Sequence, residues 1–357
     1  MPIVPAEKLH QLTRAICRGT GSIEREAELV ANHLVGANLA GHDSHGVGML
    51  PIYVRCWTEN NLRPNQHVKV VRDQGPILVI DGQRGFGQVI AHEAMELGMA
   101  KAKEEGAAIV ALRNSFHIGR IGHWSTLCAK AGFASMHYVN VVDNEPIVAL
   151  HGAAEPVVST NPYSAAMPGR GDDPLVLLDM ATSTIAMGKV RVAKNKGVPV
   201  PEGCLIDRGG KPTQDGGCMF PERQGALLAM GQHKGSGLAL ICELFAGALT
   251  GAHTLQPGNP RTGGAVNNML SVIIDPGAID DAASCLDESE AMVNHAKGAR
   301  LREGFDEILM PGEPEKRQRK ARLAQGVDVD ETSWREILEA ATTAGVTQAE
   351  IDAIVKA

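Results

Sequence analysis

Residues 91–119 read AHEAMELGMAKAKEEGAAIVALRNSFHIG and combine two elements of different period. Up to Gly106, alanine, methionine and leucine recur at helical spacing, and glycine commonly ends a helix. Residues 107–115 then begin with six consecutive apolar residues, which indicates a buried strand. A helix that leads directly into a buried strand is typical of α/β proteins.

The same alternation continues on both sides of this stretch. We expect strands at 77–82, 133–142, 173–183 and 268–276, and further helices at 122–132 and 184–197. The most apolar window, 237–252, contains Glu243 and is too short to span a bilayer, so it is predicted to be a buried helix. The expected fold class is therefore α/β.

Both ends of the chain have helical patterns instead. We expect helices at 6–19, 22–41, 313–326 and 334–345, with Ser22 and Ser333 as N-caps of the second and fourth. The simplest arrangement packs the two ends together. It divides the chain into a helical domain of residues 1–75 with 311–357 and an α/β domain of residues 76–310.

Composition restricts the surroundings and partners of the protein. A net charge of −7 disfavours binding to nucleic acid or to an anionic membrane. The seven cysteines are widely spaced and form no Cys-x-x-Cys pair, a pattern that fits a reducing cytoplasm. The N-terminus lacks the basic and apolar segments of a signal peptide. We expect a cytoplasmic protein that binds neither nucleic acid nor membrane.

The common nucleotide-binding and hydrolase signatures are missing. RGTGSIE (18–24) follows a helix and lacks the third glycine of a Rossmann fingerprint, and there is no Walker A sequence. HKGSGLA (233–239) has its glycines in the wrong order for a nucleophile elbow. The chemistry must therefore come from other residues.

His117 is the first candidate. It follows the predicted strand 107–115, and ligands of α/β sheets bind at the carboxyl ends of strands. Histidine titrates near neutrality and can both take and give a proton, so His117 is a candidate general acid and base. A hydrogen-bonded core histidine is the alternative.

The second candidate is the segment just after the predicted helix 22–41, which contains His42, Asp43, Ser44 and His45. These side chains suit proton transfer at His45, with His42 in local packing. They also suit a metal-dependent lyase or hydrolase that uses His42 and His45. No Cys or second His pair supplies the other half of a metal site, so we expect no metal. A non-catalytic binding protein is the third alternative.

Other polar stretches have a functional and a structural interpretation each. In LLDMATS (177–183), Asp179 can bond ribose or phosphate, or the stretch can merely cap the next helix. Lys234 in GQHKGSG (231–237) begins a helix, which makes it either an anion contact or a solvated charge. A basic cluster could meet a 2′-phosphate, although an exposed helix favours solvation; it consists of Lys189, Arg191, Lys194 and Lys196.

Seven stretches together resemble the malate/L-lactate dehydrogenase family of the second type, which includes ureidoglycolate, sulfolactate and 2-hydroxycarboxylate dehydrogenases. In chain order they are GHDSHGVGMLPIYV, NSFHIGRIGHW, STNP, LLDMATSTIAMGKV, GVPVPEGCLID, GQHKGSGLAL and MPGE. The resemblance runs from about residue 8 to beyond residue 340. The bacterial 2-hydroxycarboxylate dehydrogenases share the most similar forms of AGHDSHG and HIGRIG.

The resemblance implies a homodimer with a non-Rossmann fold, in which the mixed-sheet central domain binds NAD or NADP. It implies that a small 2-hydroxy acid gives hydride to nicotinamide and a proton to histidine, and that a 2-oxo acid gains both in reverse. The implied catalytic residues are His117, His45, Ser44 and Asp179. The implied cofactor contacts are His45, Gly119, Arg120, Ile121, Asp179, Met180, Lys234, Asn268, Gly312 and Glu313.

This chain departs from the family at one position that matters for the substrate. Many members carry an arginine where this chain has Met49, and that arginine can hold the substrate carboxylate. Another residue must then bind the carboxylate, and the pocket is expected to be roomier or less polar. A cyclic-imine or ureidoglycolate-type substrate is the alternative within the family.

Overall fold

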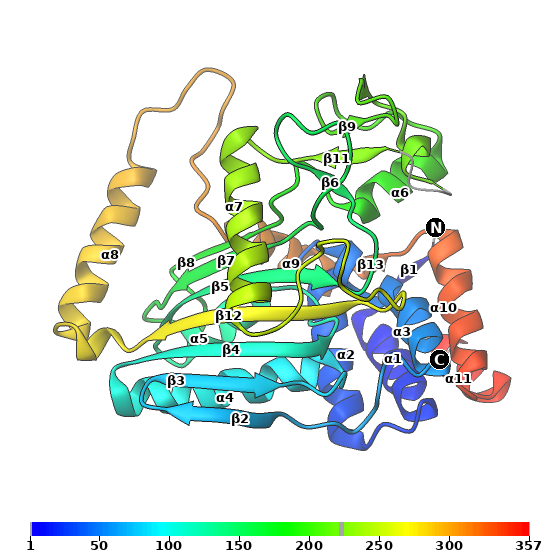
Figure 1. The fold of residues 1–357 in the computed structure, drawn as a ribbon, viewed down its shortest axis with the longest axis horizontal. Coiled ribbons are helices and arrows are strands. Elements are labelled where there is room, and N and C mark those ends of the chain that lie inside the picture. Colours follow the sequence, from blue (N-terminus) through cyan, green and yellow to red (C-terminus); the bar gives the residue numbers. More distant parts are fainter. Residues whose placement is uncertain (1, 221–224, 357) are drawn as a thin grey trace.

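The fold is described by a computed structural model that covers residues 2–220 and 225–356 (Figure 1). Its central element is a seven-stranded sheet with the order β2-β3-β4-β12-β5-β7-β8. These strands are β2 (Lys69–Gln74), β3 (Ile77–Asp81), β4 (Ala107–Phe116), β5 (Ala134–Val142), β7 (Tyr163–Met167), β8 (Val176–Met180) and β12 (Val266–Ile274). Only β3 and β4 run parallel and the other neighbours are antiparallel, so the sheet is mixed, as the family resemblance implies.

The late strand β12 lies between β4 and β5 and pairs with both over their whole length. Ile274 lies opposite Ala107 and Ala134 at one end of the strand, and Val266 lies opposite Phe116 and Val142 at the other end. Because β4 ends at Phe116, the chain leaves the sheet at this second end of the strands. His117 therefore begins the segment that follows the sheet.

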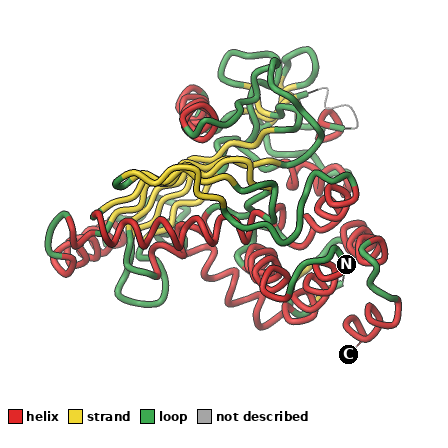
Figure 2. The backbone as a smooth tube through the Cα atoms, turned by 60° about the horizontal axis from the view of Figure 1, so that its bottom comes forward, coloured by secondary structure: helices red, strands yellow, loops and turns green. Residues whose placement is uncertain are grey.

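Two helices cover one face of the sheet (Figure 2). They are α4 (Gly87–Glu105) and α5 (Gly122–Lys130), each of which contacts the strand next to it in sequence. Ile90 and Met95 of α4, Trp124 of α5 and Val110 of β4 are all fully buried in one apolar core. Burial of such side chains supplies about 1.5–3 kcal/mol each, which is enough to hold the helices on the sheet.

Helices from both ends of the chain pack together and lie at one end of the sheet (Figure 1). They are α1 (Ala6–Gly19), α2 (Glu24–Leu39), α3 (Leu50–Thr58), α10 (Glu331–Thr343) and α11 (Gln348–Lys356). A single core contains Leu12 and Leu34 from the beginning of the chain and Ile337 and Ile351 from its end. The short strands β1 (Ile3–Val4) and β13 (Val327–Asp328) add an antiparallel pair between the two ends.

A second, four-stranded sheet was not expected from the sequence. Its order is β10-β9-β11-β6, and its strands are β6 (Val148–Ala149), β9 (Leu205–Ile206), β10 (Pro212–Thr213) and β11 (Ala226–Leu228). Strands of two or three residues are too short to show an alternating pattern. The sheet shares an apolar core with α6 (Met187–Lys196), whose start is three residues later than predicted because residues 184–186 are still extended or bent.

The apolar window 237–252 is only partly buried, so its prediction as a buried helix was wrong in part. It forms the end of α7 (His233–Glu243) and a π-helical segment, Leu244–Leu249. Ala239 and Cys242 are fully buried, whereas Leu240 and Leu244 are more than 40% exposed. Within residues 2–220 and 225–356, no helix is long and apolar enough to cross a membrane.

Both predicted N-caps were wrong. α2 begins at Glu24, and the Ser22 hydroxyl donates to the Glu26 carboxylate instead of capping the helix. α10 begins at Glu331, and its cap is Asp330, whose carboxylate accepts from the backbone N–H of Ser333. At α2 the serine hydroxyl is taken up by a carboxylate, and at α10 the carboxylate of Asp330 takes the cap position itself.

Candidate active site

A cavity of about 910 Å³ opens where the terminal helices, the edge of the large sheet and α6 meet. Its lining residues come mostly from segments 38–48, 179–196, 314–322 and 328–333, together with Arg120, Ile121, Thr160, Pro162 and Met230. The first segment contains the His42–His45 stretch and the second follows β8. The cavity therefore collects most of the polar stretches that the sequence singled out.

The end of α2 places the His42–His45 stretch in the cavity wall. Gly41 has a φ of +84°, a left-handed conformation that ends the helix, and the N–H of His42 returns to the carbonyl of Ala37. Asp43 is then held by both guanidinium nitrogens of Arg322, at 2.7 and 3.0 Å. Arg322 lies on α9 (Glu313–Gln325), so a helix near the end of the chain fixes this segment.

Ser44 and His45 form a hydrogen-bonded pair at the cavity. The Ser44 hydroxyl lies 3.0 Å from Nδ1 of the His45 ring. Gly188 of α6 packs against Ser44, and a Cβ at this position would lie 2.7 Å from the Ser44 Cβ. The absence of a side chain at Gly188 thus lets α6 close over the serine.

His117 lies beside the aromatic rings of His45 and Tyr53. The Tyr53 hydroxyl of α3 lies 2.7 Å from Nδ1 of His117, and the Gln88 amide of α4 donates to that hydroxyl at 2.8 Å. The rings of His45 and His117 stack with centroids 5.6 Å apart and planes 17° apart. The sequence therefore identified two histidines that the fold brings into contact.

Burial keeps both histidines neutral at pH 7. Loss of water lowers the pKa of His117 to about 3, and the neighbouring His45 adds to the shift. Loss of water likewise lowers the pKa of His45 to about 4, although the Asp179 carboxylate partly opposes it. Neutral imidazoles at rest can gain a proton when an anion arrives, which suits acid–base chemistry on a negatively charged substrate.

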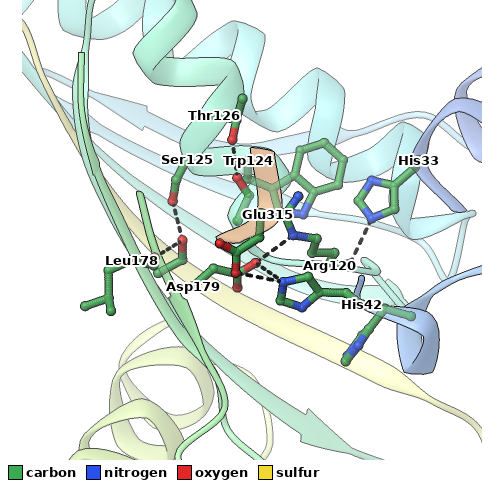
Figure 3. Close-up of polar contacts among 12 residues, drawn as sticks. His33, His42, Arg120, Trp124, Ser125, Thr126, Leu178, Asp179 and Glu315 are labelled. Atoms are coloured by element: carbon green, nitrogen blue, oxygen red, sulfur yellow. Dashed lines mark hydrogen bonds and ion pairs between the residues drawn. The ribbon is translucent and has the colours of Figure 1, made fainter. Parts of the chain in front are cut away.

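Arg120 and Asp179 form a buried ion pair in the same region, near His42 (Figure 3). Nε of Arg120 donates to the Asp179 carboxylate at 2.8 Å, and the two side chains are only 11% and 7% exposed. Nη2 of Arg120 is buried without a partner in the described structure.

Gly119 has a φ of +75° and would clash with the His33 ring if it carried a Cβ. This glycine therefore lets the backbone N–H of Arg120 reach Nε2 of His33 at 2.8 Å.

His42 takes part in the cavity wall, and the expectation that it serves local packing stays a prediction. Nε2 of His42 lies 3.3 Å from the Glu315 carboxylate and 4.0 Å from that of Asp179 (Figure 3). The His42 hydrogen bond lowers the pKa of Glu315. Within the described residues, no group of three or more His, Cys, Asp or Glu side chains has the arrangement of a metal site.

The remaining residues implied by the family resemblance divide into two sets. Ile121 and Met180 line the cavity with Ser44, His45, Arg120 and Asp179. Gly119, Lys234, Asn268, Gly312 and Glu313 do not line it. Lys234 is exposed at the start of α7, and Asn268 is buried in β12, where its amide bonds Asn140. Glu313 pairs with Lys297, while the next two residues of α9, Pro314 and Glu315, face the cavity.

Other residues of the site were not assigned from the sequence. Three of the four basic residues of α6 line the cavity, namely Lys189, Arg191 and Lys196. The fourth, Lys194, lies over the Phe220 ring. The sequence shows these four basic residues close together in LLDMATSTIAMGKVRVAKNKG, but it favoured an exposed helix with solvated charges over a phosphate contact. Tyr53 and Gln88 had no signal of their own, because only the packing of α3 and α4 against β4 joins them to His117.

Comparison with known proteins assigns the chain to a family. Residues 4–338 match the family model described as malate/L-lactate dehydrogenase. The chain is 46% identical to hydroxycarboxylate dehydrogenase B of Escherichia coli O157:H7 over 98% of this chain and 96% of that protein. It is 33% identical to L-sulfolactate dehydrogenase of Methanocaldococcus jannaschii, over 96% of this chain and 98% of that protein.

Solved structures agree with this assignment. An Escherichia coli protein assigned to malate/lactate dehydrogenases superposes with a TM-score of 0.95 at 44% identity, over 100% of this chain and 99% of that chain. The sulfolactate dehydrogenase from Methanocaldococcus jannaschii superposes with a TM-score of 0.84 at 32% identity, over 97% and 98%. The fold and these relatives thus define a dehydrogenase, and the chain belongs to the malate/L-lactate dehydrogenase family. The family predicted from the seven sequence stretches is confirmed.

Proposed function

We propose that this protein is an NAD(P)-dependent oxidoreductase that interconverts a 2-hydroxycarboxylate and a 2-oxocarboxylate. The observation that carries the proposal is the stacked pair of His45 and His117, each with its Nδ1 hydrogen-bonded to a hydroxyl group. Nδ1 contacts of this kind orient a ring and leave Nε2 for a ligand. The names of the relatives, hydroxycarboxylate and sulfolactate dehydrogenase, support a 2-hydroxy acid as the substrate class.

The cavity fits a nicotinamide cofactor, NAD or NADP. Its wall contains Lys189 and Lys196, which can pair with phosphate oxygens. The unpartnered Nη2 of Arg120 is a buried donor that awaits an acceptor, since buried donors are rarely left unpaired. When bound, the nicotinamide ring supplies the hydride acceptor for oxidation and the hydride donor for reduction. We leave Lys234, Asn268, Gly312 and Glu313 out of the assigned contacts because they lie away from the cavity wall.

His117 moves the proton in this proposal. During oxidation, Nε2 of His117 takes the proton from the substrate hydroxyl as hydride leaves C2. During reduction, the carbonyl oxygen takes that proton back from Nε2 as C2 gains hydride. An anionic substrate beside the ring raises the lowered pKa of His117, so the proton is held only when the substrate is present. We assign His45, held by Ser44 and facing Asp179, to orienting the reacting oxygen.

Arg191 is the residue that we assign to the substrate carboxylate. Met49, at the position of the family arginine, packs against the core of the terminal helices. Arg191 instead approaches the same segment from α6, with Nη2 3.9 Å from the place where a Cβ of Gly48 would be. A guanidinium can bind a carboxylate through two parallel hydrogen bonds, so Arg191 can replace the family arginine from the opposite wall.

We also propose that the protein is a homodimer. The exposed side of α7 and of the segment that follows carries Leu240, Ile241, Leu244 and Leu249, which are 40–65% exposed. An apolar patch of this kind is stabilised when a second copy covers it.

The experiment that tests the function is a panel of 2-oxo acids of increasing size, each with NADH and with NADPH. We expect oxidation of a reduced cofactor with at least one 2-oxo acid, and release of the matching 2-hydroxy acid. Consumption of cyclic imines alone would favour the alternative within the family. Activity that chelation abolishes and added zinc or iron restores would overturn the proposal.

A further inference from the structure

The side-chain carbonyl oxygen of Gln88 lacks a hydrogen-bond donor among the described residues. Its Oε1 is buried and has no hydrogen-bond partner in the described structure, and the residue is 1% exposed. The Nε2 of the same amide donates to the Tyr53 hydroxyl at 2.8 Å and to the backbone carbonyl of His117 at 3.3 Å. A buried orphan acceptor at this place requires an explanation, because such groups are rare and costly.

The hydrogen bonds fix the proton positions in this arrangement. The Tyr53 oxygen accepts from Gln88, and its O–H finds an acceptor when it points to Nδ1 of His117, 2.7 Å away. Nδ1 must therefore be bare, and the neutral ring carries its proton on Nε2. This tautomer cannot take a proton from a substrate hydroxyl, because Nε2 is already protonated.

A half-turn of the Gln88 amide reverses the bond between Gln88 and Tyr53 and, through it, the bond between Tyr53 and His117, and it gives up the bond from Nε2 to the backbone carbonyl of His117. Oε1 then faces Tyr53 and accepts its O–H, and the Tyr53 oxygen becomes free to accept from an N–H at Nδ1. The neutral ring now carries its proton on Nδ1, and Nε2 has a free lone pair. The two tautomers hold the same number of protons, since one proton leaves Nε2 and one arrives at Nδ1. The doubly protonated ring is also satisfied only in this second arrangement.

We propose that Gln88, acting through Tyr53, is the positioning residue that sets the tautomer of His117 and so makes Nε2 competent for proton transfer. This inference rests on the proposed function. In the competent arrangement Nδ1 keeps its proton throughout, and only Nε2 exchanges a proton with the substrate. Where many acid–base histidines have a carboxylate at this nitrogen, this chain has a tyrosine and an amide that can face either way.

Among the described residues, no charged side chain is hydrogen-bonded to the His117 ring. The groups around its ring are His45 from the segment after α2, His33 from α2 and Tyr53 from α3, and Cys17 and Cys56 lie near Tyr53. Burial raises the pKa of Tyr53, so the hydroxyl keeps its proton. It can therefore link the orientation of the Gln88 amide to the protonation of Nδ1 of His117 by hydrogen bonds alone.

The tests are Gln88→Glu, Gln88→Met and Tyr53→Phe. A carboxylate at position 88 can only accept, so Gln88→Glu fixes the proton on Nδ1; we expect retained reduction of 2-oxo acids and an upward shift of about one unit in the pKa that its pH profile reports. Gln88→Met leaves Tyr53 donating to Nδ1 and is expected to reduce kcat by about 10- to 100-fold, within the range of general acid–base effects. In Tyr53→Phe, the addition of Gln88→Glu should no longer shift the profile. Gln66→Met and Tyr138→Phe are the matched controls, because they remove an amide and a hydroxyl away from His117.

A second measurement does not depend on turnover. Histidine labelled with ¹⁵N reports which ring nitrogen carries the proton, and His117→Asn identifies the His117 signals. We expect a measurable population with the proton on Nδ1 in the wild type and its loss in Gln88→Met. Equal tautomer populations in both proteins, or unchanged pH profiles in active Gln88 variants, would overturn the relay and leave the proposed function standing. Failure of the 2-oxo acid panel would remove the proposed function while the NMR result still decides the tautomer.

Discussion

The rings of His45 and His117 stack 5.6 Å apart, although one follows the end of a helix near the N-terminus and the other follows a strand of the central sheet. Each ring has its Nδ1 held by a hydroxyl group, from Ser44 and Tyr53 respectively. The contact joins the terminal helices to the sheet at the cavity. An enzyme built in this way depends on the relative placement of both parts.

His117→Asn is expected to reduce kcat by about 10²- to 10⁴-fold, since the asparagine cannot exchange a proton near neutrality. Cofactor affinity, measured by quenching of tryptophan fluorescence with reduced nicotinamide, should change little because His117 is not one of the proposed cofactor contacts. Retention of more than about a tenth of the wild-type rate, with the chemical step rate-limiting, would remove His117 from the mechanism.

Stability should fall as pH decreases from about 6.5. Burial lowers the pKa of His117 and that of His137 to about 3. Between about pH 6.5 and pH 3 the unfolded chain therefore binds protons at these histidines that the folded protein does not bind. Each such histidine costs up to about 1.4 kcal/mol per pH unit between its unfolded and folded pKa. Urea unfolding at pH 7, 6 and 5 measures the slope, and His137→Gln should make it shallower. The prediction fails if His137→Gln leaves the slope unchanged.

Asp179→Asn should lower the free energy of unfolding by about 3–5 kcal/mol, because Arg120 is left charged and buried without its partner. Thermal and urea unfolding measure this loss. Glu339→Gln is the matched control: it breaks a pair with Arg335 in which both side chains are 68% exposed, and it should cost less than about 1 kcal/mol. Similar losses in the two variants would mean that the buried Arg120–Asp179 pair contributes no more to the free energy of unfolding than an exposed pair.

Arg191→Met should raise KM for the 2-oxo acid by about 10- to 100-fold with a smaller effect on kcat, since a charged hydrogen bond contributes roughly 1.5–3 kcal/mol. Steady-state kinetics at saturating cofactor measure the effect. Lys194→Met is the control on the same helix, because Lys194 lies over Phe220 and away from the cavity. A change confined to cofactor affinity would assign Arg191 to the cofactor instead.

Leu240→Asp combined with Leu244→Asp should convert the dimer to a monomer in sedimentation velocity at micromolar concentration, because the charges disrupt an apolar contact. Leu323→Asp, at a leucine of α9 that is more exposed than either, should leave the dimer intact. A wild-type protein that sediments as a monomer at every concentration would contradict the assignment of the α7 face.

Sequence reasoning succeeded where an element has its own periodicity. The strand 107–116, the helices that flank it and the helical ends have enough residues to show a pattern, and His45 and His117 lie at the ends of such elements. The small sheet was missed because its strands contain two or three residues. Tyr53 and Gln88 were missed because their link to His117 exists only after α3 and α4 pack, and no local pattern encodes that contact.

The double hydrogen bond from Arg322 to the Asp43 carboxylate has a consequence for synthesis of the protein. The chain emerges from the ribosome with the His42–His45 segment early and its anchor very late. A nascent chain can form the helix α2 and much of the sheet, but this anchor of the catalytic segment is absent until residue 322 has left the exit tunnel. A ribosome that stops before α9 thus releases a chain whose His42–His45 segment lacks this anchor.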